Sequence, residues 1–248
     1  MMRKSLIETY TMFKRNALIS MRNLDAVMNS VIVAALMMVL FVYVFGGAIN
    51  VNDFNYVDFI VPGVLIQCIA QGAAPVAINI NHDLKGGVVE RFRSLNIAKS
   101  SFLIGHVAAA TFTITVVIGV ALLMGFRPQA SFLDWLSILA LLFLFVIAMT
   151  WLAIIFGLMA SSPEAASAFM IVSVIPYLSS GFVPTETMPK FVRFFAENQP
   201  MTPMINTLRG LMLDGPTTDL PLALLWIFGI IALSWIFAVI LYNKKTNF

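Results

Sequence analysis

Six long apolar stretches recur along the 248-residue chain, and short polar segments separate them. Each stretch has about 20 residues, which is enough for an α-helix to cross about 30 Å of hydrocarbon. The pattern predicts transmembrane helices over residues 28–47, 58–80, 102–125, 134–159, 165–182 and 220–242. We therefore expect an all-α membrane protein with one transmembrane domain over residues 1–248 and no separate soluble domain.

The segment before the first apolar stretch is amphipathic. Its apolar residues recur at intervals of four and three and so share one helical face: Leu6, Tyr10, Phe13, Ala17, Met21 and Leu24. We expect a helix over residues 3–24 that lies flat at the cytoplasmic surface, with this face in the acyl boundary. The alternative is a basic leader whose periodicity is accidental.

The second apolar stretch contains helix-breaking and polar residues. Pro62 and Pro75 free backbone carbonyls that neighbouring helices must satisfy, so we expect a kinked helix packed inside the bundle. Gln67 and Gln71 are four residues apart and share one face. They either hydrogen-bond across a helix interface, which bundle chemistry favours, or line a polar path for a substrate.

The longest polar segment lies between the fifth and sixth stretches. Four prolines interrupt it: Pro184, Pro189, Pro200 and Pro203. Thr187 and Thr202, each shortly before a proline, are typical of helix starts. We expect a hairpin of two short helices over residues 189–197 and 203–213, each too short to cross the bilayer. It is either an ordinary surface hairpin or a lid over an outward-facing cavity.

Composition and charge support a membrane protein and orient it. The chain is 60% hydrophobic and 11% charged, which a soluble domain of this length could not bury in one core. One side of the predicted bundle carries most basic residues: Arg3, Lys4, Lys14, Arg15, Arg22, Lys85, Arg91, Arg93, Lys99, Lys244 and Lys245. The other side has Arg127, Lys190, Arg193 and Arg209. The positive-inside rule therefore places both termini in the cytoplasm.

Several kinds of chemistry are absent from the sequence. The net charge of +3 is too small to suggest a nucleic-acid partner, and the two histidines lack the spacing of a metal site. No Walker loop occurs, so we expect no ATP site in this chain. Carboxylates fall at the ends of the apolar stretches, where they can stay hydrated, and no ionisable residue lies at the midpoint of a stretch. That pattern disfavours an ion-coupled carrier and suggests an external energy source.

The cytoplasmic segment after the second stretch, GGVVERFRSLNIAKSSFLIGH, is more elaborate than a turn requires. Asn81 or Asp83 can cap a helix over residues 84–97. Such a helix would present an aromatic residue, Phe92, and charged residues, Glu90 and Arg91, to the cytoplasm. It is either an element that engages a soluble motor or a stop-transfer loop whose cations hold the topology.

This segment closely resembles the cytoplasmic loop of ABC-2 type permeases, in particular the daunorubicin-resistance group of drug-efflux permeases. FVYVFGGAI, YVDFIVPGVL, SSPEAASAF and SSGFVPTETMPKFVRFFAENQPMTPMINTLRGLM fit the same group in the same order. The chain departs at Asn96, Lys99 and His106, where the group usually has Pro, Arg and Arg. The lost proline leaves the exit angle of the helix open.

The resemblance implies a permease in the bacterial cytoplasmic membrane, most simply a homodimer, that pairs with two copies of a separate ATPase subunit. That partner would bind ATP and Mg, and this chain would hold no cofactor. The residues implied to couple to the ATPase are Val89, Glu90, Arg91, Phe92, Arg93 and Leu95.

The implied activity is export of a lipophilic or amphipathic, drug-like cargo, which the uncharged interior of the predicted bundle would suit. Export of a lipid-linked glycan or polysaccharide by the same mechanism is an alternative. A proton-coupled carrier and a non-transporting scaffold that binds a cytoplasmic partner through the loop are further ones.

Overall fold

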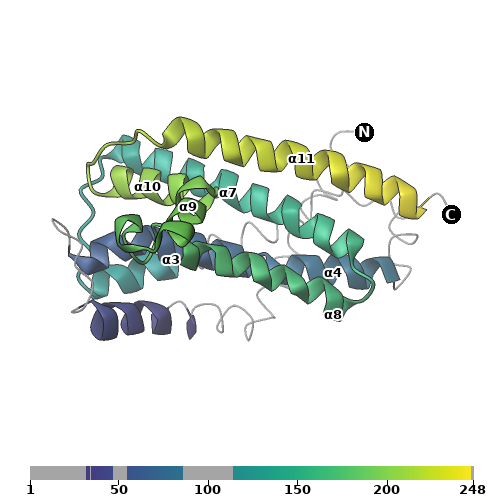
Figure 1. The fold of residues 1–248 in the computed structure, drawn as a ribbon, viewed down its shortest axis with the longest axis horizontal. Coiled ribbons are helices and arrows are strands. Elements are labelled where there is room, and N and C mark those ends of the chain that lie inside the picture. The colour runs from purple at the N-terminus through teal and green to yellow at the C-terminus, as the bar shows by residue number, and fades with distance from the viewer. Residues whose placement is uncertain (1–31, 34, 47–54, 86–113, 247–248) are drawn as a thin grey trace, which may run out of the picture.

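The computed structural model describes residues 32–33, 35–46, 55–85 and 114–246. These residues form helices and short connections without a strand among them, as the sequence predicts (Figure 1). The helices are η1 (Leu40–Phe45), α3 (Tyr56–Gly72), α4 (Ala74–Lys85), α7 (Phe132–Met159), α8 (Pro163–Ala166), η2 (Ser167–Leu178), η3 (Thr185–Thr187), α9 (Lys190–Asn198), α10 (Met201–Met212) and α11 (Leu220–Thr246).

Three helical stretches among these residues are long and apolar enough to cross a membrane: Tyr56–His82, Phe132–Met159 and Leu220–Leu241. They correspond to the second, fourth and sixth predicted spans. Shorter apolar helices at Ala35–Phe45, Ile114–Leu123 and Pro163–Leu178 overlap the other three. The predicted helix over residues 3–24 and the whole cytoplasmic segment, residues 86–106, lie outside the described residues.

Helix α7 packs against α3, α4, α10 and α11 in the described bundle. Figure 1 shows α9 and α10 at one end of the bundle and the C-terminus at the opposite end. The most apolar window of Tyr56–His82 is 83% buried, whereas that of α11 is 17% buried. Helix α3 therefore forms part of the core, and α11 presents an apolar outer face of the kind that lipid covers.

The second span was predicted to be kinked, and in the structure its α-helix is interrupted once, between α3 and α4. Pro62 is accommodated inside α3, and α-helical structure breaks only at Ala73, between Gly72 and Pro75. Proline lacks the N–H that would continue the hydrogen-bond ladder, so a break close to Pro75 is expected. The interior position predicted for this span is also confirmed.

Neither Asn81 nor Asp83 begins a helix, because both lie inside α4, so that prediction is wrong. The Nδ2 of Asn81 donates hydrogen bonds to the carbonyl oxygens of Gly157 at 3.0 Å and Ala160 at 2.7 Å. The last carbonyls of a helix lack partners within it, and Asn81 supplies a donor to two of them at the end of α7. A Cβ on Gly157 would lie 2.5 Å from the oxygen of Ala77. The end of α4 is thus fastened closely to the end of α7.

Replacing Asn81 with leucine is expected to destabilise the protein by about 1–3 kcal/mol, because both carbonyl oxygens lose this donor. Thermal unfolding in detergent measures the change. Asn198→Ala is the matched control, since Asn198 donates to Phe194 on exposed α9 and crosses no helix interface. Equal stability of Asn81→Leu and Asn198→Ala would contradict the role of Asn81.

Candidate functional site at the α9–α10 end of the bundle

The predicted hairpin between the fifth and sixth spans is present as α9 and α10, but its helix starts differ from the prediction. Pro189 and Pro200 occupy the positions before the two helices, not Thr187 and Thr202. Gln199 explains the earlier start of α10, because its Oε1 accepts the N–H of Met201 at 2.8 Å. Thr202 instead lies within α10 and donates to the carbonyl oxygen of Ala196 at 2.5 Å.

The four prolines mark the boundaries of this hairpin. Pro184 precedes the turn η3, Pro189 and Pro200 directly precede α9 and α10, and Pro203 lies in the first turn of α10. Proline is tolerated at these positions because the first N–H groups of a helix have no partner within it.

Helix α9 is the exposed arm of the hairpin. Phe191 is 86% exposed and Phe194 70% exposed, while Arg193 and Glu197 form an ion pair at 2.7 Å along the helix. Aromatic rings beside charged side chains suit a membrane–water interface.

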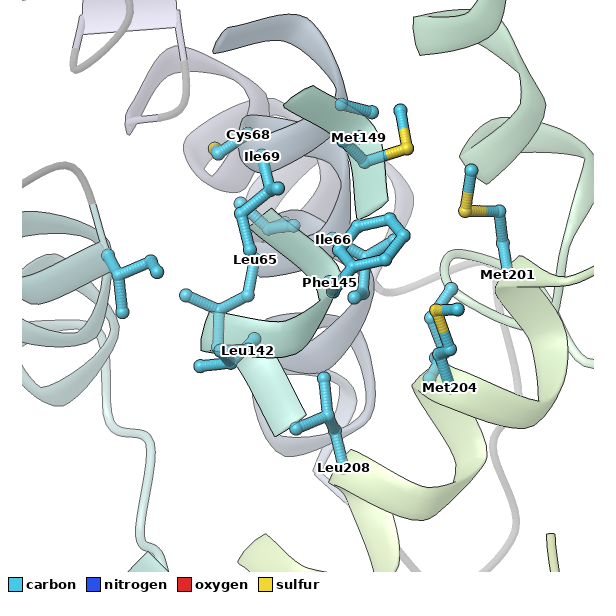
Figure 2. Packing of buried hydrophobic residues seen from close by; sticks show 14 of the residues in the cluster. Leu65, Ile66, Cys68, Ile69, Leu142, Phe145, Met149, Met201, Met204 and Leu208 are labelled. Atoms are coloured by element: carbon cyan, nitrogen blue, oxygen red, sulfur yellow. The ribbon is translucent and has the colours of Figure 1, made fainter. Parts of the chain in front are cut away.

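Helix α10 is the buried arm and does not fit an ordinary surface hairpin. Met201, Met204 and Leu208 are at most 2% exposed and point toward α3 and α7 (Figure 2). Phe145 and Met149 of α7 are also fully buried in this cluster. This end of the bundle, which the positive-inside rule predicts to be external, is therefore filled by side chains of the hairpin itself.

Arg209, near the end of α10, joins three parts of the chain. Its Nε and Nη2 donate to the carbonyl oxygen of Phe59 at 3.2 and 3.1 Å, and Nη2 also donates to Ser180 at 2.6 Å. Nη1 donates to Oδ1 of Asn206 at 3.1 Å. The guanidinium also lies 4.0 Å from the centre of the Phe59 ring. Burial lowers the pKa of Arg209 to about 10, so it is protonated at neutral pH.

A buried irregular segment follows η2 and is held by α10. The N–H of Ser180 donates to Oγ1 of Thr202 at 3.3 Å, and the Ser180 hydroxyl donates to Asn206 at 2.7 Å. Asn206 in turn donates to Asp219, just before α11, at 2.8 Å. Buried backbone outside a helix must find such partners, and here α10 supplies them.

Helix α3 touches the same irregular segment directly. A Cβ on Gly63 would lie 2.5 Å from the oxygen of Gly181, so the two backbones meet without side chains between them. The hydroxyl of Tyr56 donates to the carbonyl oxygen of Phe182 at 2.8 Å. Small residues allow this kind of close approach between membrane helices.

Asp58 lies at the start of α3, as predicted, but it is 7% exposed and so is not hydrated as expected. Its Oδ1 accepts the backbone N–H of Arg127 at 3.0 Å. This bond, together with the helix N-terminus, stabilises the buried carboxylate. It also ties the turn before α7 to the first turn of α3.

Gln67 and Gln71 both lie in the C-terminal half of α3. Gln67 is 6% exposed, and its Oε1 has no hydrogen-bond donor among the described residues. A buried acceptor without a donor costs free energy unless another molecule supplies one. Gln71 is only partly buried. The implied ATPase-coupling residues, from Val89 to Leu95, lie outside the described residues.

A separate apolar cavity of about 470 Å³ lies between the 114–118 segment and the first half of α7. Its lining is aliphatic and aromatic apart from Thr115: Ile114, Thr115, Ile118, Leu136, Leu139, Ala140, Leu142, Phe143 and Val146. Among the described residues, no group of three or more His, Cys, Asp or Glu side chains could hold a metal ion.

Sequence reasoning missed Arg209 and treated it as one of the few external cations. The available signal was its position inside an otherwise apolar helical pattern, INTLRGLM, where a cation needs buried partners. The partners themselves are carbonyl oxygens far away in the chain, which no local pattern reveals.

Comparison with known proteins gives consistent matches. Residues 7–213 match the family described as ABC-2 type transporter. A daunorubicin resistance ABC transporter permease protein of Streptomyces coeruleorubidus is 28% identical over 188 residues, covering 73% of this chain and 66% of the relative, just under two thirds of its length. A probable doxorubicin resistance ABC transporter permease protein of Mycobacterium tuberculosis is 23% identical over 253 residues, covering 98% and 90%.

Proposed function

This chain belongs to the ABC-2 type transporter family, and from that premise we propose that it exports a lipophilic or amphipathic, drug-like cargo with energy from a separate ATPase subunit. The observation that carries the proposal is the similarity to two drug-resistance permeases, one of which aligns over almost the whole chain. Permeases of this family lack a nucleotide-binding domain, so the chain is not itself an ATPase.

The proposed assembly has two copies of this permease, six spans in each, and two copies of the ATPase in the bacterial cytoplasmic membrane. The ATPase would bind ATP and Mg. The residues proposed to meet it are Val89, Glu90, Arg91, Phe92, Arg93 and Leu95. The hydrogen bonds from Asn81 of α4 to the end of α7 support this arrangement, because α4 leads directly into the segment that contains these residues.

We assign the external gate to α10 and the prolines that bound its hairpin: Pro184, Pro189, Pro200 and Pro203. The burial of Met204 and Leu208 among residues of α3 and α7 supports this assignment. An exporter must part these contacts before cargo leaves. The apolar cavity beside α7 would suit a lipophilic cargo, although its lining names no specific one.

Transport by the reconstituted complex tests the proposed function. Inverted vesicles that hold the permease and its partner ATPase should accumulate a fluorescent anthracycline when ATP is added, and an uncoupler should leave uptake unchanged. Uptake that collapses with the uncoupler at constant ATP would identify a proton-coupled carrier instead. Transport of a lipid-linked glycan but no drug would favour the glycan alternative, and no movement of either would favour a scaffold.

Gln67 is expected to accept a hydrogen bond from the cargo, because its Oε1 is buried without a donor among the described residues. Gln67→Leu should lower export of a cargo with a hydroxyl or amine donor by about three- to tenfold, as one lost hydrogen bond implies. An analogue that lacks the donor is the matched control and should be exported equally by both proteins. Equal losses for both cargoes would assign Gln67 to helix packing.

A further inference from the structure

We propose that the external end opens along the seam between α3 and α10, and that Arg209 is the positioning residue that holds this seam closed. This inference rests on the proposed export function, because only a transporter needs the end to open. Beyond that function, the inference identifies the two surfaces that separate and the residue that opposes their separation.

One side of α10 is bound to the irregular segment after η2 by polar contacts. Three hydrogen bonds join them: Ser180 N–H to Thr202, the Ser180 hydroxyl to Asn206, and Arg209 to the Ser180 carbonyl. Separating these surfaces would leave buried backbone groups without partners, which is costly inside a membrane. We therefore infer that α10 and residues 179–181 move as one unit.

The side of α10 that faces α3 is different. Met201, Met204 and Leu208 meet an apolar part of the core to which α3 contributes Ile66 and α7 contributes Phe145 (Figure 2). Apolar surfaces can part and close again without leaving unpaired hydrogen-bonding groups, and methionine adapts readily to altered packing. The Gly63–Gly181 contact likewise involves no interlocking side chains.

Two polar links of α3 cross this seam. Tyr56 donates one neutral hydrogen bond to Phe182. Arg209 donates two bonds to the Phe59 carbonyl and lies over the Phe59 ring, while the same Nη2 also holds Ser180. Bonds from a charged donor are about twice as strong as neutral ones. Arg209 therefore contributes most of the polar resistance to opening.

A cysteine in place of Ile66 provides a reporter of this seam. The chain's single natural cysteine, Cys68, points away from α10 and is replaced by alanine in this background (Figure 2). Ile66 is 1% exposed and lies seven residues after Phe59, or about 10 Å along the helix. A membrane-impermeant sulfonated maleimide added outside intact cells reaches the Ile66→Cys thiol only when the external end opens.

The experiment compares the labelling rate of this reporter in the full-length permease, expressed with its partner ATPase and either otherwise wild type or carrying one further substitution. Arg209→Met should be labelled about tenfold faster than wild type and Tyr56→Phe about two- to threefold faster. Arg209→Lys keeps the charge but cannot reach both carbonyl oxygens with a planar fork, so its rate should lie between wild type and Arg209→Met. Arg193→Met, in the exposed ion pair of α9, is the control and should match wild type.

Wild-type labelling rates in both Tyr56→Phe and Arg209→Lys would overturn the proposal, even if Arg209→Met fails to accumulate. Equal acceleration by reagent added to inverted membranes would also overturn it, because that pattern reports unfolding. The labelling needs no transport, so the two ideas can fail separately. Fast labelling of Arg209→Met alongside a failed drug-uptake assay would contradict the export function and leave the seam in place.

Discussion

Alanine in place of Glu90 or Arg91 is expected to reduce drug export to the level of cells that lack the permease, while the protein still inserts. Both residues belong to the segment that we propose binds the ATPase. Charged contacts fix the register of such an interface, and removing one leaves its partner unpaired. ATP hydrolysis by the complex should continue, so the defect is one of coupling.

The described structure explains how a movement of that segment would reach the membrane. Helix α4 (Ala74–Lys85) directly precedes the segment, and Asn81 binds the last carbonyls of α7. Gly157 lets the two helices approach so closely that a side chain there would clash. A displacement of the loop would therefore move α4 and α7 together.

Parallel assays of export and ATP hydrolysis measure this coupling. Lys244→Ala is a suitable control, because it removes a basic residue from the same predicted cytoplasmic side but outside the loop. Undiminished export in both the Glu90 and Arg91 variants would remove the coupling role from this segment.

A side chain at Gly63 is expected to prevent the external end from packing as observed. Alanine would place its Cβ 2.5 Å from the oxygen and 2.7 Å from the Cα of Gly181, and backbone atoms cannot rotate away as a flexible side chain can. Overpacking of this kind costs about 1–3 kcal/mol, and leucine should cost more. We expect Gly63→Ala to lose stability and Gly63→Leu to fail to accumulate in the membrane.

Thermal unfolding and membrane yield measure these effects. Gly72→Ala is the matched control in the same helix, because a Cβ there would meet nothing within 4 Å. Gly63→Ala with the unfolding temperature of Gly72→Ala would contradict the direct contact between α3 and residue 181.

Local patterns predicted the location of several helices. Apolar stretches located the three long spans, and Pro189 marked the start of α9 because proline favours the beginning of a helix. The start of α10 was predicted at Pro203 and lies at Met201 instead. Pro62 and Pro75 predicted a kink, and the helix breaks close to Pro75 alone. These features depend on neighbouring residues in the chain, so one sequence suffices to find them.

Long-range contacts could not be predicted in the same way. Asn81 has the side chain of a helix cap, but its partners are carbonyls almost 80 residues away, so the local interpretation failed. Arg209 pairs with a carbonyl 150 residues away. The fifth span forms the 3₁₀-helix η2 over Ser167–Leu178, although its hydrophobic pattern suits an α-helix equally well. Tertiary packing decides each of these features.

We propose that this permease works through a soluble ATPase that binds its cytoplasmic segment. A photo-crosslinking amino acid at Phe92 in native cells, followed by mass spectrometry of the captured protein, tests it most directly. We expect capture of a soluble chain that carries Walker motifs. Capture of nothing but lipid or a second copy of the permease would contradict it.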